Sequence, residues 1–320
     1  MTDVTTNPAG SVDVVSAAVG DGRADRRPPL RFGLFLSQAN KSWSQVVDDF
    51  QMAERLGFDH AWLVDHLVDT DGPPENGCHE AWTLLAALAT LTSRIRLGVL
   101  VTSNTFRNPA LLLKEAVTVD HVSGGRLILG LGTGWHEDEH RRYGFDLPAA
   151  GERVARLEEA VQVIRLLMGQ ERTTFNGRFY RLDDARLVPA PVQRPIPILI
   201  AAHRPRMLRV AARYADQWDT FAAMDGTATE GVEADVAGRI AALDAACREV
   251  GRDPNEIRRS TWASGAVLRS TDAYLDFVRR HHALGFTDFT TVLPAPEHEP
   301  VLERVAREVI PALRSGGLLG

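Results

Sequence analysis

The feature that most constrains this chain is a regular alternation of short apolar runs with amphipathic helical patterns from residue 30 onward. The runs are rich in leucine and β-branched residues on both faces, as expected of parallel strands that are buried on both sides. Eight such strand–helix pairs can be traced, which favours a closed barrel over an open doubly wound sheet. We therefore predict an α/β fold, a (β/α)8 TIM barrel that forms a single catalytic domain over residues 30–320. The expected strands are 31–36, 60–64, 95–101, 126–130, 196–200, 217–220, 259–263 and 287–292.

The expected helices follow these strands and carry recognisable end signals. Ser42 and Gln45 have the spacing of a capping box, and Gly57 is placed to end the helix that begins there. Pro109 suits the first turn of the helix after the third strand. The remaining helices are expected at 81–91, 109–121, 154–169, 205–214, 236–250, 271–284 and 300–313.

Two segments do not fit the repeat. Residues 170–195 are predicted to be an insertion before strand five, with Asn176-Gly177 as a tight hairpin turn. Residues 1–29 are rich in Asp, Gly, Ala, Arg and Pro without periodicity, so we predict a disordered N-terminal extension.

Composition narrows the functional classes. The two cysteines, Cys78 and Cys247, lie far apart without metal spacing, which indicates a reducing compartment and a cytoplasmic location. The net charge of −6 gives no attraction to nucleic acid, and no apolar run approaches the roughly 18 residues of a membrane span. The sequence contains no glycine-rich dinucleotide-binding motif and no P-loop motif. Both NAD binding on a Rossmann fold and P-loop nucleotide chemistry are therefore disfavoured. Only Lys41 and Lys114 are lysines; the other basic residues are arginines.

The carboxyl ends of the strands are where a barrel of this kind places its active site. Asp65 and His66 follow the second expected strand directly. An imidazole there exchanges protons near neutral pH, so His66 is a candidate acid–base residue. The alternative is a solvated surface turn that Asp65 caps.

The third expected strand runs into small polar residues from Thr102 to Asn104 before Pro109. Their hydroxyl and amide groups can hydrogen-bond a ring or a phosphate. The alternative is an ordinary strand-to-helix loop in which Asn108 caps the next helix.

The fourth expected strand ends in the glycine-rich stretch from Gly130 to Gly134, where the backbone can approach a flat or anionic ligand closely. The next run, HEDEHRRY, is expected to be mostly a charged and solvated helix face. It contains a literal H-E-x-x-H between His136 and His140, so a zinc hydrolase is an alternative. A zincin motif lies within a long helix with apolar flanks, and because that context is missing we predict no metal site.

The fifth expected strand runs into Ala201-Ala202-His203 and then a helix that begins at Pro205. Free backbone N–H groups at such a helix start form an anion site, to which Arg204 and Arg206 would add charge. The alternative is a routine turn.

In this order, the segments resemble the luciferase-like family of flavin and deazaflavin oxidoreductases. The resemblance covers residues 31 to about 220 and is carried by AWLVDHL, EAWTLLAALATLTSRIRLGVLVTSNTFRNPALLLKEAVTVDHVSGGRLILGLGTGWHEDEHRRYG and RPIPILIAAHRPRMLRVAARYADQWD. It implies a cofactor ring at the carboxyl mouth of the barrel, over a non-proline cis peptide bond between Leu100 and Val101. The implied cofactor-binding residues are Leu100, Val101, Thr102 and Asn104 around the ring and Gly132, Thr133, Gly134, Trp135, Ala201, Ala202 and His203 around the tail.

The resemblance also implies roles in the reaction. His66 matches the histidine that lies beside the reacting carbon in the deazaflavin-dependent dehydrogenases, where it donates or accepts a proton. Asp65 would orient the loop or the imidazole. The sugar-phosphate dehydrogenases of the family carry a glutamate where this chain has Trp135, and they bind the substrate phosphate with lysines. We therefore expect a different substrate, with Trp43, Phe106 and Trp135 as an apolar wall.

The leading hypothesis is an oxidoreductase dependent on coenzyme F420, in which hydride passes between the deazaflavin and a small, largely apolar substrate. The long anionic tail of F420 would need cations, for which Arg107, Arg141, Arg142, Arg204 and Arg206 are candidates. The alternative within the family is an FMN-dependent monooxygenase that uses O2 and reduced flavin from a separate reductase. A barrel that only binds a ligand is the alternative outside enzymes, and the resemblance makes a homodimer possible.

Overall fold

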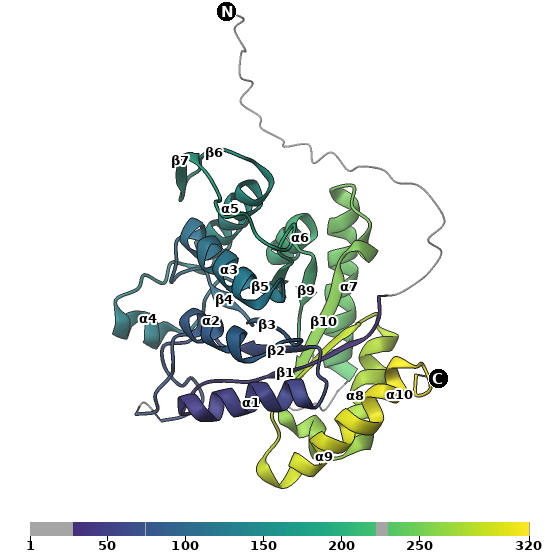
Figure 1. The fold of residues 1–320 in the computed structure, drawn as a ribbon. Coiled ribbons are helices and arrows are strands. Elements are labelled where there is room, and N and C mark those ends of the chain that lie inside the picture. Colours follow the sequence, from purple (N-terminus) through teal and green to yellow (C-terminus); the bar gives the residue numbers. More distant parts are fainter. Residues whose placement is uncertain (1–27, 74, 222–229, 320) are drawn as a thin grey trace, which may run out of the picture.

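The computed structural model describes residues 28–73, 75–221 and 230–319 and shows a closed parallel β-barrel (Figure 1). Neighbouring strands follow the order β3-β2-β1-β11-β10-β9-β8-β5-β4, and an additional pairing of β3 with β5 closes the ring. The predicted (β/α)8 barrel is confirmed. The expected disorder of residues 1–29 falls almost wholly outside the described residues. The strands are β1 (Arg31–Phe35), β2 (His60–Leu63), β3 (Arg96–Val99), β4 (Thr102–Ser103), β5 (Leu127–Gly132), β8 (Ile198–Ala201), β9 (Gln217–Asp219), β10 (Arg258–Ala263) and β11 (Asp288–Val292).

The helices form a layer outside the barrel (Figure 1). Ser42 and Gln45 make the expected capping box at the start of α1, and Asn108 caps α3 ahead of Pro109. None of the described helices is long and apolar enough to cross a membrane. The helices are α1 (Trp43–Arg55), α2 (Ala81–Leu91), α3 (Pro109–Ser123), α4 (Glu137–Tyr143), α5 (Ala150–Gly169), α6 (Pro205–Tyr214), α7 (Glu230–Glu249), α8 (Thr271–Ala283), α9 (Glu299–Arg304) and α10 (Ile310–Arg314).

The last expected helix, 300–313, is present as a continuous helical run from Glu299 to Arg314 that changes its hydrogen-bond pattern midway. A π-helical segment, Val305–Val309, separates α9 from α10. Pro311 lies in the first turn of α10, and because proline has no N–H it cannot continue the regular hydrogen-bond ladder of the preceding helix. The expected helix is therefore present, with a π-helical turn within it.

The third barrel strand is also interrupted, at the place that the family resemblance implied. β3 ends at Val99, the Leu100–Val101 peptide bond is cis, and the chain resumes pairing at Thr102 in β4. The expectation of one strand over 95–101 thus fails in its last two residues, whereas the expected cis bond is present.

The insertion before strand five is a two-stranded antiparallel hairpin of β6 (Thr173–Asn176) and β7 (Arg181–Ala185). Asn176 pairs with Arg181, and the backbone N–H of Gly177 donates to the carbonyl of Tyr180, so the turn lies at 178–179 and not at the expected Asn176-Gly177. The Glu159 carboxylate of α5 accepts hydrogen bonds from the backbone N–H groups of Phe179 and Tyr180, which stabilises the turn in this position.

The barrel interior contains one carboxyl group that should make stability depend on pH. Asp219, at the end of β9, is 2% exposed and accepts a 2.6 Å hydrogen bond from the Ser260 hydroxyl. Burial raises its pKa from 3.8 to about 7. Because the folded-state pKa exceeds that of the unfolded chain, this contribution to stability is present below pH 4 and lost as the pH rises through about 7.

We expect Asp219→Asn to abolish most of this dependence. Between pH 4 and about pH 7, the wild type should lose on the order of 2–4 kcal/mol of its free energy of unfolding through this carboxyl group. Asparagine can still accept the Ser260 hydrogen bond and carries no charge, so the variant should gain stability over the wild type at pH 8 and not at pH 4. Urea unfolding at a series of pH values measures the difference. Parallel curves for the two proteins would contradict the assignment.

Candidate active site at the carboxyl mouth of the barrel

His66 lies in the loop after β2 and is held by a carboxylate from another part of the chain. Its Nδ1 is 2.9 Å from Oε1 of Glu139 in α4, and Oε2 of the same carboxylate accepts a 2.9 Å hydrogen bond from the backbone N–H of Leu67. The side chain of His66 is 17% exposed and that of Glu139 only 2%. The carboxylate therefore fixes both the ring and the loop that carries it.

This contact determines the tautomer of His66. An ionised carboxylate only accepts hydrogen bonds, so the proton on the neutral ring must be on Nδ1. Burial raises the pKa of Glu139, but its interactions with His66, Leu67 and His136 together lower it by more, so the carboxyl stays ionised. The other ring nitrogen, Nε2, is left as the atom that can take or give a proton.

Glu139 was not singled out from the sequence, where the run after the glycines was expected to be mostly solvated. Its neighbours Glu137 and Arg141 are exposed, but Glu139 and His140 are each only 1% exposed. The helix begins at Glu137, and His136 is its N-cap residue. This starting point determines which carboxylate of the run is buried. The sequence contains no signal that separates Glu139 from Glu137 or Asp138.

Asp65 makes a different set of contacts from its neighbour His66. It accepts a 2.8 Å hydrogen bond from the backbone N–H of Ser103 and two from the guanidinium of Arg107, at 2.7 and 3.1 Å. Burial raises the pKa of Asp65, and Arg107 and Ser103 oppose that rise. Of the two expected roles, Asp65 thus has contacts that orient the loop, while Glu139 holds the imidazole.

The arginines expected along the cofactor tail are mostly engaged within the protein. Arg107 is 10% exposed and faces Asp65 and two further carboxylates, Glu80 and Glu115. Arg141 and Arg142 both pair with Asp138, and Arg206 donates to the carbonyl of Gly151. Arg204 is the exposed member of the set, at the start of α6, and none of the hydrogen bonds or ion pairs among the described residues involves its side chain.

An apolar layer in the barrel interior includes the cis peptide bond. Leu100 packs with Trp62, Ile128 and Leu199, and Val101, Phe35 and Trp262 pack against this group. The rings of Phe35 and Trp262 are stacked with centroids 5.7 Å apart and planes 7° apart. A flat, largely apolar ring system suits such a surface.

The glycines at the end of β5 are needed for packing within the protein. A Cβ on Gly130 would lie 2.1 Å from the carbonyl oxygen of Val99, and one on Gly132 would lie 2.4 Å from a methyl carbon of Val101. A Cβ on Gly134 would meet the hydroxyls of Ser103 and Thr105. These residues let β5 approach the interrupted third strand, which accounts for the glycine pattern without a ligand.

The hairpin insertion reaches this end of the barrel. The hydroxyl of Tyr180, in the 177–180 connection, accepts a 3.2 Å hydrogen bond from the side-chain amide of Asn104. Asn104 is only 6% exposed. Tyr180 was missed by the sequence analysis because the insertion was read as lying outside the repeat.

Three other expected cofactor contacts use their polar groups elsewhere. The hydroxyl of Thr102 accepts from the indole N–H of Trp82 on α2. The backbone N–H of Ala202 donates to the carbonyl of Asp219, so it is not free for a phosphate. His203 contacts Arg239, and burial together with that guanidinium lowers its pKa to about 4, so the ring is neutral at pH 7. Of the groups expected to bind an anion here, the start of α6 and the side chain of Arg204 are the ones not described above as bonded elsewhere.

The three expected substrate-wall residues are not equivalent. Trp135 is 62% exposed, and its ring packs edge-on against that of His66 with the two ring centroids 5.6 Å apart. Phe106 packs against His140 and Phe145, and its ring centroid lies 4.7 Å from that of His140 and 4.9 Å from that of Phe145. Trp43 is 43% exposed at the start of α1, and none of the ring contacts among the described residues joins it to the other two.

The H-E-x-x-H run shows a network of hydrogen bonds. His140 donates through Nδ1 to the carbonyl of His136, and its Nε2 is 2.6 Å from the hydroxyl of Thr105. Both ring nitrogens of His140 are thereby occupied. Within residues 28–73, 75–221 and 230–319, no group of three or more His, Cys, Asp or Glu side chains is placed to hold a metal ion.

Comparison with known proteins identifies the family. Residues 30–309 match the model of the luciferase-like monooxygenases, so the chain belongs to that family. It is 37% identical over 194 residues to an F420-dependent glucose-6-phosphate dehydrogenase of Kineococcus radiotolerans, covering 59% of this chain and 55% of that protein. It is 31% identical over 273 residues to the pyrimidine monooxygenase RutA of Yersinia enterocolitica, covering 76% of this chain and 73% of that protein.

A solved structure supports the fold. An F420-dependent secondary alcohol dehydrogenase in complex with an F420-acetone adduct superposes with a TM-score of 0.78 at 20% identity, covering 89% of this chain and 99% of that chain. The chain spans little more than half the length of the F420-dependent glucose-6-phosphate dehydrogenases that it matches. The relatives include both dehydrogenases and monooxygenases, with F420 or reduced FMN in their names.

Proposed function

We propose that this chain is a coenzyme F420-dependent oxidoreductase, in which hydride passes between the deazaflavin and a small, largely apolar organic substrate. The observation that carries the proposal is the His66–Glu139 pair at the carboxyl mouth, which leaves one imidazole nitrogen available beside the exposed ring of Trp135. The named activities of the F420-dependent relatives support it.

The residues at the mouth fit this role. When bound, the deazaflavin supplies or accepts the hydride. His66 Nε2 then takes the proton from a carbinol or amine that is oxidised, or gives it to the carbonyl or imine that is reduced. Glu139 keeps the proton of the neutral ring on Nδ1, and Val101 with its apolar neighbours offers a surface for the ring system. Arg204 and the start of α6 are the group that would face the anionic tail.

The substrate is unlike a sugar phosphate. Both lysines of the chain are engaged, Lys41 with Asp49 and Lys114 with the carbonyl of Val188. Trp135 stands where the sugar-phosphate dehydrogenases carry a glutamate, and its large exposed ring favours an apolar substrate.

A second candidate is an FMN-dependent monooxygenase that receives reduced flavin from a separate reductase. The match to RutA favours it, because that match extends over more of the chain than the match to the dehydrogenase.

Cofactor binding distinguishes the two candidates. We expect the purified protein to quench F420 fluorescence in a saturable titration and to bind FMN weakly or not at all. Saturable FMN binding without F420 binding would replace the first proposal with the second. Binding of neither would contradict both.

Glu139→Gln should impair the reaction without preventing cofactor binding. The amide can donate to Nδ1 as well as accept from it, so the tautomer of His66 is no longer fixed. We expect kcat to fall roughly 10- to 100-fold, as when the carboxylate partners of metal-bound histidines are removed. The matched control is Asp138→Asn, on the same helix but outside the contact with His66. Equal losses in the two variants would contradict a positioning role for Glu139.

A further inference from the structure

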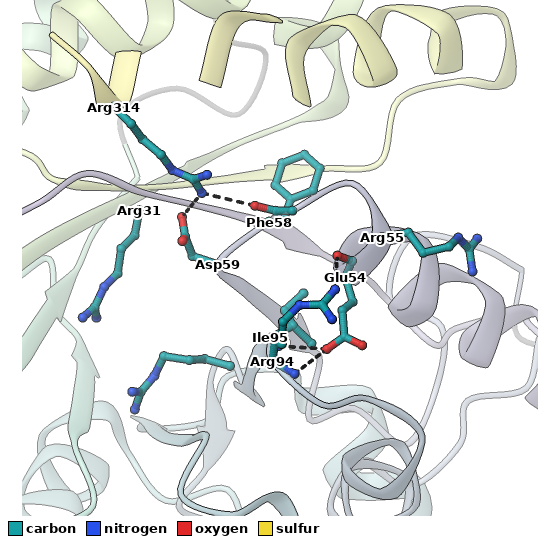
Figure 2. Close-up of a pocket in the computed structure, with 10 residues that line it drawn as sticks. Arg31, Glu54, Arg55, Phe58, Asp59, Arg94, Ile95 and Arg314 are labelled. Carbon is teal, nitrogen blue, oxygen red and sulfur yellow. Dashed lines mark hydrogen bonds and ion pairs between the residues drawn. The ribbon is translucent and has the colours of Figure 1, made fainter. Parts of the chain in front are cut away.

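A hollow at the opposite end of the barrel carries an excess of positive charge. It has a volume of about 400 Å³ and lies at the amino ends of β1, β2 and β3 (Figure 2). Two of the residues that line it, Arg31 and Arg96, start β1 and β3. Figure 2 shows Arg314 held against Asp59, while the side chain of Arg31 extends away from that pair. The full lining is Arg31, Glu54, Arg55, Gly57, Phe58, Asp59, Arg94, Ile95, Arg96 and Arg314.

Three guanidinium groups act on one another here. Burial and the neighbouring charge of Arg258 lower the pKa of Arg31, and burial and Arg31 lower that of Arg96. Asp288 pairs with Arg258 at 2.7 Å. Asp59, which also acts on Arg31, pairs with Arg314. Arginine keeps its charge at neutral pH, so positive charge remains in excess around Arg31.

Hydrogen-bond donors without partners accompany this charge. The partly exposed Arg31 guanidinium has no hydrogen bond or ion pair among the described residues. The Arg96 guanidinium donates through Nη2 to Leu127 and Gln193, while its buried Nε has no partner in the described part of the chain. Nδ1 of His60 accepts from the indole N–H of Trp62, so the neutral ring of His60 carries its proton on Nε2, which is buried and also without a partner. Burial, Arg31 and Arg258 hold the pKa of His60 at about 3, so this ring is neutral at pH 7.

We propose that this end of the barrel binds an oxyanion, namely inorganic phosphate or the phosphate group of a monoester. Arg31 would bind the oxygens, since a guanidinium matches phosphate geometry with paired N–H donors. Arg96, whose Nη2 already donates to the carbonyl of Leu127 and to Oε1 of Gln193, would add positive charge beside it. The buried Oδ1 of Asp288 is an acceptor without a partner in this layer, against two buried donors without partners, Nε of Arg96 and Nε2 of His60, so donors prevail. The site is separate from the mouth that contains His66, and the proposal does not depend on the proposed oxidoreductase activity.

The experiment is thermal unfolding of the full chain with increasing sodium phosphate, with sodium chloride keeping the ionic strength constant. We expect a saturable rise in Tm of roughly 2 °C at about ten times Kd, and no rise with chloride alone. Glycerol 2-phosphate in a parallel series distinguishes a monoester site from one that accepts only the free ion. A Tm that follows ionic strength alone would overturn the proposal.

A variant locates the effect. Arg31→Gln should abolish the phosphate-dependent rise, whereas Arg209→Gln, an exposed arginine of α6 that does not line the hollow, should retain it. If Arg31→Gln does not fold, broadening of the phosphate ³¹P resonance by the wild-type protein, reversed by sulfate, provides the direct measurement. A rise in Tm undiminished in Arg31→Gln, or a ³¹P resonance that the wild type does not broaden, would mean an adventitious ion only or none at all.

Discussion

Replacing His66 with glutamine is expected to lower kcat/KM by roughly 10²- to 10⁴-fold, the range for loss of a positioned acid–base group. Glutamine retains a polar side chain that can donate to Glu139, but it cannot exchange a proton near neutral pH. The Kd for the cofactor should change little, because His66 is proposed to act on the substrate proton. Steady-state kinetics and a fluorescence titration on the same preparation measure both quantities.

His136→Gln is the matched control for this variant. The His136 ring lies 6.0 Å from that of His66, and its Nδ1 accepts a hydrogen bond from the backbone of Glu139. If activity is lost in His136→Gln and kept in His66→Gln, His136 and not His66 is the residue that exchanges the proton. If neither variant loses activity, the mouth is not acting through an imidazole at all.

The barrel could be predicted from the sequence because its signals are local. Alternating apolar runs, the Ser42 capping box and Pro109 each act within one element, and the structure has these elements within a few residues of where they were expected. The errors lie where tertiary contacts decide. The hairpin turn lies at 178–179, beyond the expected Asn176-Gly177, where Glu159 on a neighbouring helix binds the backbone of Phe179 and Tyr180.

The candidate site was predicted in part for the same reason. His66 stands out because it follows a strand directly, whereas Glu139 becomes its partner only when α4 packs against the loop after β2. Contacts over 73 and 76 residues of sequence separation, from His66 to Glu139 and from Asn104 to Tyr180, leave no periodic pattern in the chain. Arg107 was similarly assigned to a cofactor tail because a sequence does not show which carboxylates surround an arginine.

Arg107 connects the loop that carries His66 to the third strand and to two helices. Its guanidinium contacts Asp65 beside His66, Glu80 at the start of α2 and Glu115 of α3. Burial lowers the pKa of Arg107, but the carboxylates of Asp65, Glu80 and Glu115 together raise it by more. Removing the guanidinium would leave the Asp65 carboxyl almost fully buried, with the Ser103 N–H as its remaining partner. Arg107 is therefore a residue on which both the stability of the fold and the position of His66 depend.

Arg107→Met is accordingly expected to lower the free energy of unfolding by about 3–5 kcal/mol, the range for breaking a buried ion pair by removing one partner. Without Arg107 the folded-state pKa of Asp65 rises further above its unfolded value, so the loss should be smallest near pH 4 and grow as the pH rises through neutrality. Urea unfolding at pH 5 and pH 8 tests this sign. Adding Asp65→Asn to Arg107→Met removes the unpaired charge and should restore part of the stability at pH 8, with less effect at pH 5. A loss independent of pH, or a double variant no more stable than the single one, would mean that Arg107 stabilises the fold through packing alone and not through Asp65.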